Sequence, residues 1–169
     1  MKPKTNVKLQ FANAALASAL AVAGSAAAQT LAKEGSYDYT SCYSGTSTLV
    51  ALGKTHFAFT YEQTGTNTSN PPGGYLDKVS FRCVGINSSF GGKNAGSSTC
   101  EAIDKDGDKR LTYFALERDG TMVKEFVLGT GKYEGAIEKG STSAMGPFPT
   151  IKAGTFQNCL RQTGTYKLK

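Results

Sequence analysis

The sequence predicts an all-β protein, folded as a small antiparallel β-barrel of about eight strands, with a β-sandwich as the alternative. Two observations lead to this fold class. Short runs of β-forming residues recur along the chain between breaks rich in glycine, of which there are 20. No convincing amphipathic helix follows the first 28 residues. We favour a closed barrel because closure leaves no exposed edge strand.

Eight or nine strands are expected, from nine runs in which apolar or β-branched side chains alternate or cluster. In chain order they span residues 37–43, 48–52, 56–62, 76–86, 99–104, 111–118, 121–128, 133–138 and 155–168. The last run divides into two strands if Gly164 interrupts it. Two polar, glycine-rich stretches, 64–74 and 87–98, are expected to be loops. We interpret the first as a solvated connector, with a lid over the barrel mouth as the alternative.

One tight hairpin is expected at Arg118-Asp119-Gly120-Thr121, because Asp-Gly suits the positive φ angles of a type I′ turn. Alternation then assigns the side chains of both flanking strands to faces. On 111–118, Tyr113 and Phe114 face opposite ways. On 121–128, one face carries Met122, Lys124, Phe126 and Leu128.

Residues 1–28 have the three parts of a secretory signal peptide. Lysines provide the positive start, residues 11–23 are apolar, and small residues at Ala26 and Ala28 form the expected cleavage site. The apolar run is too short for a membrane span, which needs about 20 residues, and no later segment approaches that length. We therefore expect a single barrel domain, residues 29–169, that is periplasmic or secreted.

Cleavage would change the charge of the protein. It removes three lysines and no acidic residue, so the formal net charge falls from +6 to +3. The remaining Lys and Arg residues are dispersed along the chain and interleaved with acidic residues. This charge pattern argues against a nucleic-acid partner.

The four cysteines, Cys42, Cys83, Cys100 and Cys159, all lie in the exported part. An even number in an oxidising compartment predicts two disulfides. Three pairings are possible. We favour Cys83 with Cys100 because these residues flank a loop, and Cys42 with Cys159 would then tie the first strand to the last. Because the chain has no C-x-x-C motif, a redox or metal site is not expected.

Three other stretches do not meet the requirements of the sites they suggest. Residues 104–108 (DKDGD) lack the Gly and Glu that an EF-hand needs at its sixth and twelfth positions, so we expect an acidic turn, with another kind of calcium turn as the alternative. Residues 129–132 (GTGK) lack the spacing of a P-loop. The single histidine, His56, is expected on the strand face opposite Phe57 and Phe59, with no acid–base partner. We therefore predict no metal and no cofactor.

Aromatic side chains are the best candidates for a binding site, since a small barrel can enclose one small ligand. The proposed ligand-binding residues are Phe57, Phe59, Tyr61, Phe81, Tyr113, Phe126 and Tyr133, from a wider set that also contains Tyr75, Phe114, Phe148 and Phe156. The alternative is that these rings fill the core of a solid barrel.

The segment 126–140, FVLGTGKYEGAIEKG, resembles the G-T-G-[KR]-[FY]-x-G-x-x-G segment of the allene oxide cyclase and dirigent-like barrels. Bacterial secreted proteins of unknown role carry similar segments. The resemblance implies an eight-stranded antiparallel barrel with an apolar cavity, often oligomeric. It is confined to this segment and carries over no catalytic residue.

Three functions follow as hypotheses. The first is a secreted or periplasmic barrel that binds a small apolar ligand in its interior. The second is a cyclase- or isomerase-type enzyme that uses cavity shape and one or two polar groups. The third is an envelope interaction protein with a solid barrel. Because the sequence shows no acid–base set, we lean away from an enzyme. A homo-oligomer is compatible with each hypothesis.

Overall fold

The computed structural model describes residues 31–146 and 148–169, so the expected signal peptide lies outside the described residues. One short 3₁₀ helix, η1 (Gly131–Tyr133), precedes β7. The strands are β1 (Glu34–Ala51), β2 (His56–Ser69), β3 (Ser80–Phe90), β4 (Lys93–Ile103), β5 (Lys109–Leu116), β6 (Met122–Gly129), β7 (Ile137–Ala144) and β8 (Thr155–Lys167). No helix among the described residues is long and apolar enough to span a membrane.

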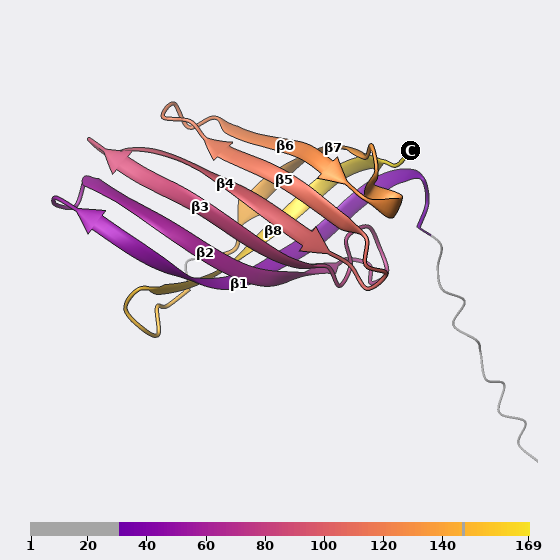
Figure 1. Ribbon diagram of the computed structural model, residues 1–169, viewed down its shortest axis with the longest axis horizontal. Helices are drawn as coiled ribbons and strands as arrows, with labels where there is room; N and C mark the ends of the chain where they lie inside the picture. Colours follow the sequence, from indigo (N-terminus) through magenta and orange to yellow (C-terminus); the bar gives the residue numbers. More distant parts are fainter. Residues whose placement is uncertain (1–30, 147) are drawn as a thin grey trace, which may run out of the picture.

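All strand pairs are antiparallel, in the order β6-β5-β4-β3-β2-β1-β8-β7. The sheet curls so that its two end strands, β6 and β7, approach each other in a nearly closed barrel (Figure 1). The predicted all-β barrel fold is confirmed. Because β1 pairs with β8 as well as with β2, the first and last strands of the chain lie side by side in the barrel wall.

The connections alternate between two ends of the barrel. We call the end with the short turns after β1, β3 and β5 the open end. The other end, the closed end, carries residues 70–79, residues 104–108 and η1. There Tyr75, Leu76, Tyr133 and Tyr166 belong to a buried core, and the rings of Tyr75 and Tyr166 stack with centroids 4.1 Å apart. These side chains plug the barrel at one end.

Only the second half of the polar stretch 64–74 is the loop that the sequence predicts. It lies at the closed end, so it does not form a lid over the open mouth. The first half continues β2 to Ser69. The second half leads into the loop that buries Tyr75 at the closed end. The prediction of a second loop at 87–98 is also wrong, because β3 and β4 continue through most of this stretch. Only Gly91 and Gly92 lie between them, as a two-residue turn.

Glycines inside the strands make room for aromatic rings instead of breaking the strands. A Cβ on Gly45 would collide with the Glu62 backbone carbonyl and lie 2.7 Å from the Phe156 ring, and a Cβ on Gly164 would collide with the Lys139 carbonyl and lie 2.7 Å from the Tyr37 ring. For this reason β1 joins the two predicted strands 37–43 and 48–52, and β8 passes through Gly164 without a break.

The β5–β6 hairpin lies where the sequence predicts it, but its turn differs from the predicted type. The Glu117 amide donates to the Thr121 carbonyl at 2.9 Å, which leaves a three-residue loop. Gly120 has a positive φ of 92°, whereas Asp119 is not among the residues with positive φ. A type I′ turn needs positive φ at both central residues, so the three-residue loop with glycine in the left-handed position replaces it.

Two further expectations around β6 are wrong. The range 133–138 is not one strand, because η1 and a turn occupy residues 131–136 and β7 begins at Ile137. Leu128 does not share the face of Met122, Lys124 and Phe126, since the register shifts between Leu111 and Thr112. Such a bulge adds one residue and reverses the side-chain alternation beyond it, and Leu128 is left 64% exposed.

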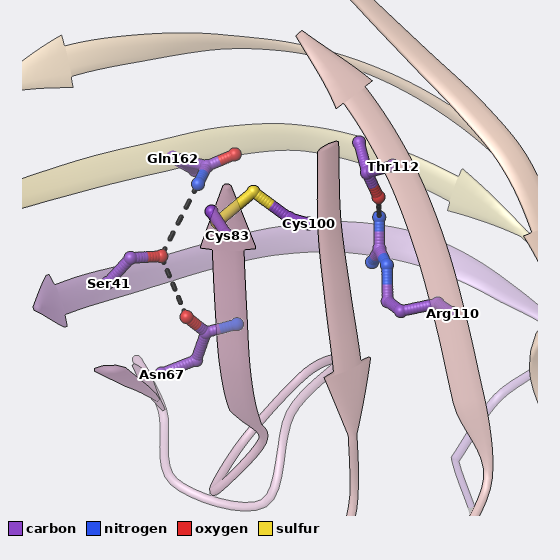
Figure 2. The surroundings of a disulfide bond; sticks show 7 residues. All are labelled: Ser41, Asn67, Cys83, Cys100, Arg110, Thr112 and Gln162. Atoms are coloured by element: carbon purple, nitrogen blue, oxygen red, sulfur yellow. Dashed lines mark hydrogen bonds between the residues drawn. A yellow bond between two sulfur atoms is a disulfide. The ribbon is translucent and has the colours of Figure 1, made fainter. Parts of the chain in front are cut away.

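Both disulfides form with the pairing favoured from the sequence. Cys42 is bonded to Cys159 across β1 and β8, and Cys83 to Cys100 across β3 and β4. They lie on opposite faces of the wall: Cys42 is exposed on the outer face, whereas Cys83 is buried and its disulfide borders the barrel interior (Figure 2).

Candidate functional site

The barrel encloses a cavity of about 640 Å³ between the closed-end core and the open end. Strand alternation builds it, because every second side chain of each strand points inward. On β1, for example, the inward set includes Tyr39, Ser41, Tyr43, Ser47 and Leu49. The volume falls within the range of pockets that hold small organic ligands.

Aromatic and aliphatic side chains make up most of the cavity wall. The rings and large apolar groups are Tyr43, Leu49, Phe59, Tyr61, Phe81, Phe114, Leu116, Met122, Phe156 and Leu160. Several rings meet edge to face: Tyr43 with Phe81 at 6.3 Å, and Tyr61 with Phe156 at 6.0 Å between centroids. This is a favourable arrangement for aromatic pairs, so the wall offers ring faces and edges to a bound molecule.

A hydrogen-bonded polar group lies at the closed end of the cavity. Ser41 donates to Asn67 at 2.7 Å, and the Gln162 amide donates to Ser41 at 3.3 Å (Figure 2). Tyr39 donates its hydroxyl hydrogen to Gln162 Oε1 at 3.0 Å. We call these four residues the polar floor. All four are buried, and their mutual hydrogen bonds satisfy groups that burial would otherwise leave unpaired.

Two cations share one carboxylate beside the polar floor. Arg110 Nη1 on β5 lies 2.6 Å from Glu138 Oε1 on β7, and Lys124 Nζ on β6 lies 3.0 Å from Glu138 Oε2. Tyr75 also donates to Glu138 Oε1 at 2.6 Å. Arg110 and Lys124 line the cavity, whereas Glu138 does not. We call Arg110, Lys124 and Glu138 the charged triad.

Burial and mutual attraction both act on the charges of the triad. Burial opposes ionisation of Glu138, but the charges of Arg110 and Lys124 outweigh burial and lower its pKa to about 2. Burial lowers the pKa of Lys124, and Arg110 adds to this effect while Glu138 opposes it. The pKa of Arg110, in contrast, is raised, because burial opposes its charge but the attraction of Glu138 outweighs burial.

The structure brings three of the seven predicted ligand-binding residues to the cavity: Phe59, Tyr61 and Phe81. Phe57 shares their strand face and stacks on Phe59 at 6.2 Å, but is not part of the lining. Tyr113 lies on the outer face of β5, since its neighbours Thr112 and Phe114 point into the cavity.

The other two predicted residues belong to the closed end. Phe126 packs against the core cluster and lies under the Arg110 guanidinium, 5.5 Å from its ring centroid. Tyr133 projects from η1 into the core. Their rings form the plug beneath the cavity, and the structure does not bring them to its lining.

The sequence does not predict the polar floor or the charged triad. Lys124 carried the clearest signal, because alternation placed it on one strand face with Met122 and Phe126. A lysine within an apolar strand face requires either exposure or a buried partner. The partner, Glu138, lies at the start of β7, whereas the sequence predicts it at the end of a strand spanning residues 133–138.

The acidic turn at residues 104–108 forms as expected and binds a lysine. Asp104 Oδ1 accepts hydrogen bonds from the amides of Asp106 and Asp108 at 2.9 and 3.1 Å. Lys132 Nζ lies 2.6 Å from Asp104 Oδ2 and 2.7 Å from Asp106 Oδ2. Its ammonium therefore lies between two of the carboxylates that suggested calcium. No group of three or more metal-binding side chains is found in the described part of the chain.

His56 lies at the open end on the outer face of β2. It is exposed, and its Nδ1 is 3.1 Å from the hydroxyl of Thr55. The structure therefore keeps it away from the cavity, as the alternation with Phe57 and Phe59 predicts.

Comparison of the chain with protein-family models, with curated proteins and with solved structures finds no match.

Proposed function

We propose that this protein is an exported β-barrel that binds a small, mainly apolar molecule in its interior. The observation that carries the proposal is the open cavity of about 640 Å³ above a plugged barrel end. In a solid barrel of this size, side chains would fill the space. The mixture of aromatic walls and a few fixed polar groups is typical of pockets for small ligands.

The disulfides support the exported part of the proposal. Two of them form, and no free cysteine is found in the described residues. Such bonds persist in oxidising compartments, including the periplasm and the extracellular space. Cleavage at the expected signal peptide remains a prediction, which mass determination of the protein from its own host would test.

Binding can be tested with N-phenyl-1-naphthylamine, a neutral probe whose fluorescence rises in apolar surroundings. The wild-type protein should bind it in a saturable way with one site. Ser47 lines the cavity and Thr48 is exposed on the opposite face of the same strand. Ser47→Phe should therefore weaken binding by filling the cavity, whereas Thr48→Phe should not.

Equal binding by both variants would place the probe on the outer surface and contradict the proposal. Far-UV circular dichroism of each variant establishes that it is folded. Native mass spectrometry of the protein purified from its own host provides a second readout, since a retained ligand should appear as a discrete added mass that Ser47→Phe abolishes.

A cyclase or isomerase activity is the second candidate, because Lys124 and Tyr39 place ionisable groups in the cavity lining. Chromatography of a ligand before and after incubation with the protein separates the two candidates. A binding protein returns the molecule unchanged, whereas an isomerase returns a product of the same mass with a different retention time. The enzyme candidate also draws on the resemblance of residues 126–140 to the allene oxide cyclase and dirigent-like barrels, and membership of that superfamily remains a prediction.

A further inference from the structure

The charge of the cavity lining is unbalanced. Its only charged side chains among the described residues are those of Arg110 and Lys124, both cationic. Glu138, the carboxylate that contacts both of them, lies behind the lining. The charged triad therefore has a net charge of one positive unit, in a site where low solvent access makes charge imbalance costly.

Lys124 is the cation of the triad that is more open to the cavity. The Arg110 guanidinium is engaged by Glu138, by Thr112 at 3.2 Å and by the ring of Phe126, and its side chain is 5% exposed. The Lys124 ammonium contacts Glu138 and donates to Gln162 Oε1 at 3.3 Å. It also lies 5.7 Å from the centroid of the Tyr37 ring. Of its three N–H donors, one has no oxygen or nitrogen acceptor within the described part of the chain. Its side chain is 21% exposed.

The Lys124 ammonium shares the cavity with several aromatic rings. Tyr43, Phe81, Phe114 and Phe156 line the cavity together with Lys124, and Tyr43 meets Phe81 and Phe156 edge to face, so the lining presents aromatic surfaces to a bound molecule. Flat aromatic molecules pack well against such surfaces. Resting on the cavity-binding function proposed above, we propose that the ligand is an aromatic monoanion, whose anionic group binds the Lys124 ammonium and whose rings lie against the aromatic wall.

Burial supports this assignment independently of the ligand's shape. The pKa of Lys124 is lowered because burial opposes its charge; Glu138 offsets burial only in part, and Arg110 adds to the lowering. A carboxylate or sulfonate next to its ammonium would supply further opposite charge. An anion bound near Lys124 would also complete a cluster of two cations and two anions.

A pair of competitors that differ only in charge tests the proposal on the wild-type protein. 2-Naphthoate and 2-naphthamide have the same ring system, and each can displace N-phenyl-1-naphthylamine. We expect naphthoate to displace the probe at a concentration about tenfold lower or more, the factor that a charge-assisted hydrogen bond supplies. Equal displacement would overturn the inference while leaving apolar binding intact.

Variants of Lys124 then locate the charge. Lys124→Met should bring naphthoate and naphthamide to equal potency as competitors, each measured against the variant's own affinity for the neutral probe. Lys124→Arg, which keeps the charge, should retain the preference. A preference that survives in a folded Lys124→Met protein would assign the anion to another residue and overturn the inference. If the wild-type protein does not bind the neutral probe, both the proposed function and this inference fail.

Discussion

The carboxylate of Glu138 on β7 lies 3.0 Å from the ammonium of Lys124 on β6, although these strands occupy the two ends of the sheet order and are not paired with each other. Arg110 on β5 holds the other oxygen of the same carboxylate. Where the backbone ladder is interrupted, side-chain charges therefore join the two edges of the barrel wall. The same residues supply the cationic part of the cavity lining, so closure of the barrel and the chemistry of the cavity depend on one cluster.

Glu138→Gln should destabilise the protein by about 3–5 kcal/mol, because it leaves two buried cations without their counter-charge. The free energy of unfolding from urea denaturation measures this effect. Glu62→Gln is the matched control, since Glu62 forms an exposed ion pair with Arg82 at 2.7 Å and exposed pairs contribute little. If the two substitutions had the same small effect, the triad would not hold the seam between β6 and β7.

The protein should lose stability in acid through the same carboxylate. The pKa of Glu138 is lowered to about 2 in the folded state from an ordinary value of 4.5. A lowered folded-state pKa gives stability that is fully present above the unfolded value and is lost as the pH falls from about 4.5 towards 2. Urea denaturation at successive pH values should show this decline in the wild-type protein.

Other carboxylates contribute to the acid response, including Asp104, whose pKa is also lowered, by Lys132 against the opposing effect of burial. The informative quantity is therefore the difference between wild type and Glu138→Gln. That difference should shrink as the pH falls below 4.5, and a difference that stays constant down to pH 2 would contradict the assignment of Glu138 as the ionised partner.

The two disulfides should differ in their contribution to stability. Cys42 and Cys159 are separated by 117 positions, whereas Cys83 and Cys100 are separated by 17. Loop-closure entropy then predicts a cost of about 5 kcal/mol for removing the first and about 3 kcal/mol for removing the second. Replacement of each pair by alanines, followed by urea denaturation, compares them.

Packing predicts the opposite ranking of the two disulfides to chain entropy, because Cys83 is buried at 2% exposure and Cys42 is exposed. A larger loss from Cys83→Ala with Cys100→Ala would show that contacts in the cavity wall outweigh chain entropy. Mild reduction of the folded protein gives a second comparison, in which the exposed Cys42–Cys159 bond should react first.

The sequence predicts the fold class because strand alternation and turn residues are local signals. It predicts both disulfides because the chain offers few pairings. It misplaces Leu128 because one bulge reverses the alternation, and a bulge has no compulsory sequence signal. It misreads Gly45 as a break because the atoms that exclude a side chain there, the Glu62 carbonyl on β2 and the Phe156 ring on β8, lie far away in the sequence.

The sequence does not predict the charged triad either, because its members are also distant from one another in the sequence. Arg110, Lys124 and Glu138 come from three strands, and only closure of the barrel brings them together. Strand periodicity shows which face each residue occupies, as it does for Lys124 beside Met122 and Phe126. It does not show which residue lies opposite across an unpaired seam. Predicting the site therefore requires the tertiary structure.

The turn after β6 offers a test of how the closed end is held. Gly131 has a positive φ of 53°, and a Cβ at this position would collide with the carboxylate of Asp108. Asp108 Oδ2 accepts the Lys132 amide at 3.1 Å, and Lys132 binds Asp104 and Asp106. The turn after β6 is thus fastened to the turn after β4 by close contact and by charge. Gly131→Ala should strain the backbone and also push these turns apart.

Gly107→Ala separates the two effects, because Gly107 also has a positive φ, 86°, but no atom lies near its Cβ position. The control should cost about 1–2 kcal/mol, the backbone cost of the left-handed conformation alone. Gly131→Ala should cost clearly more in urea denaturation and should increase hydrogen exchange of the Lys132 amide. Equal losses in the two variants would mean that the turns move apart freely and that the contact with Asp108 contributes nothing to closing this end of the barrel.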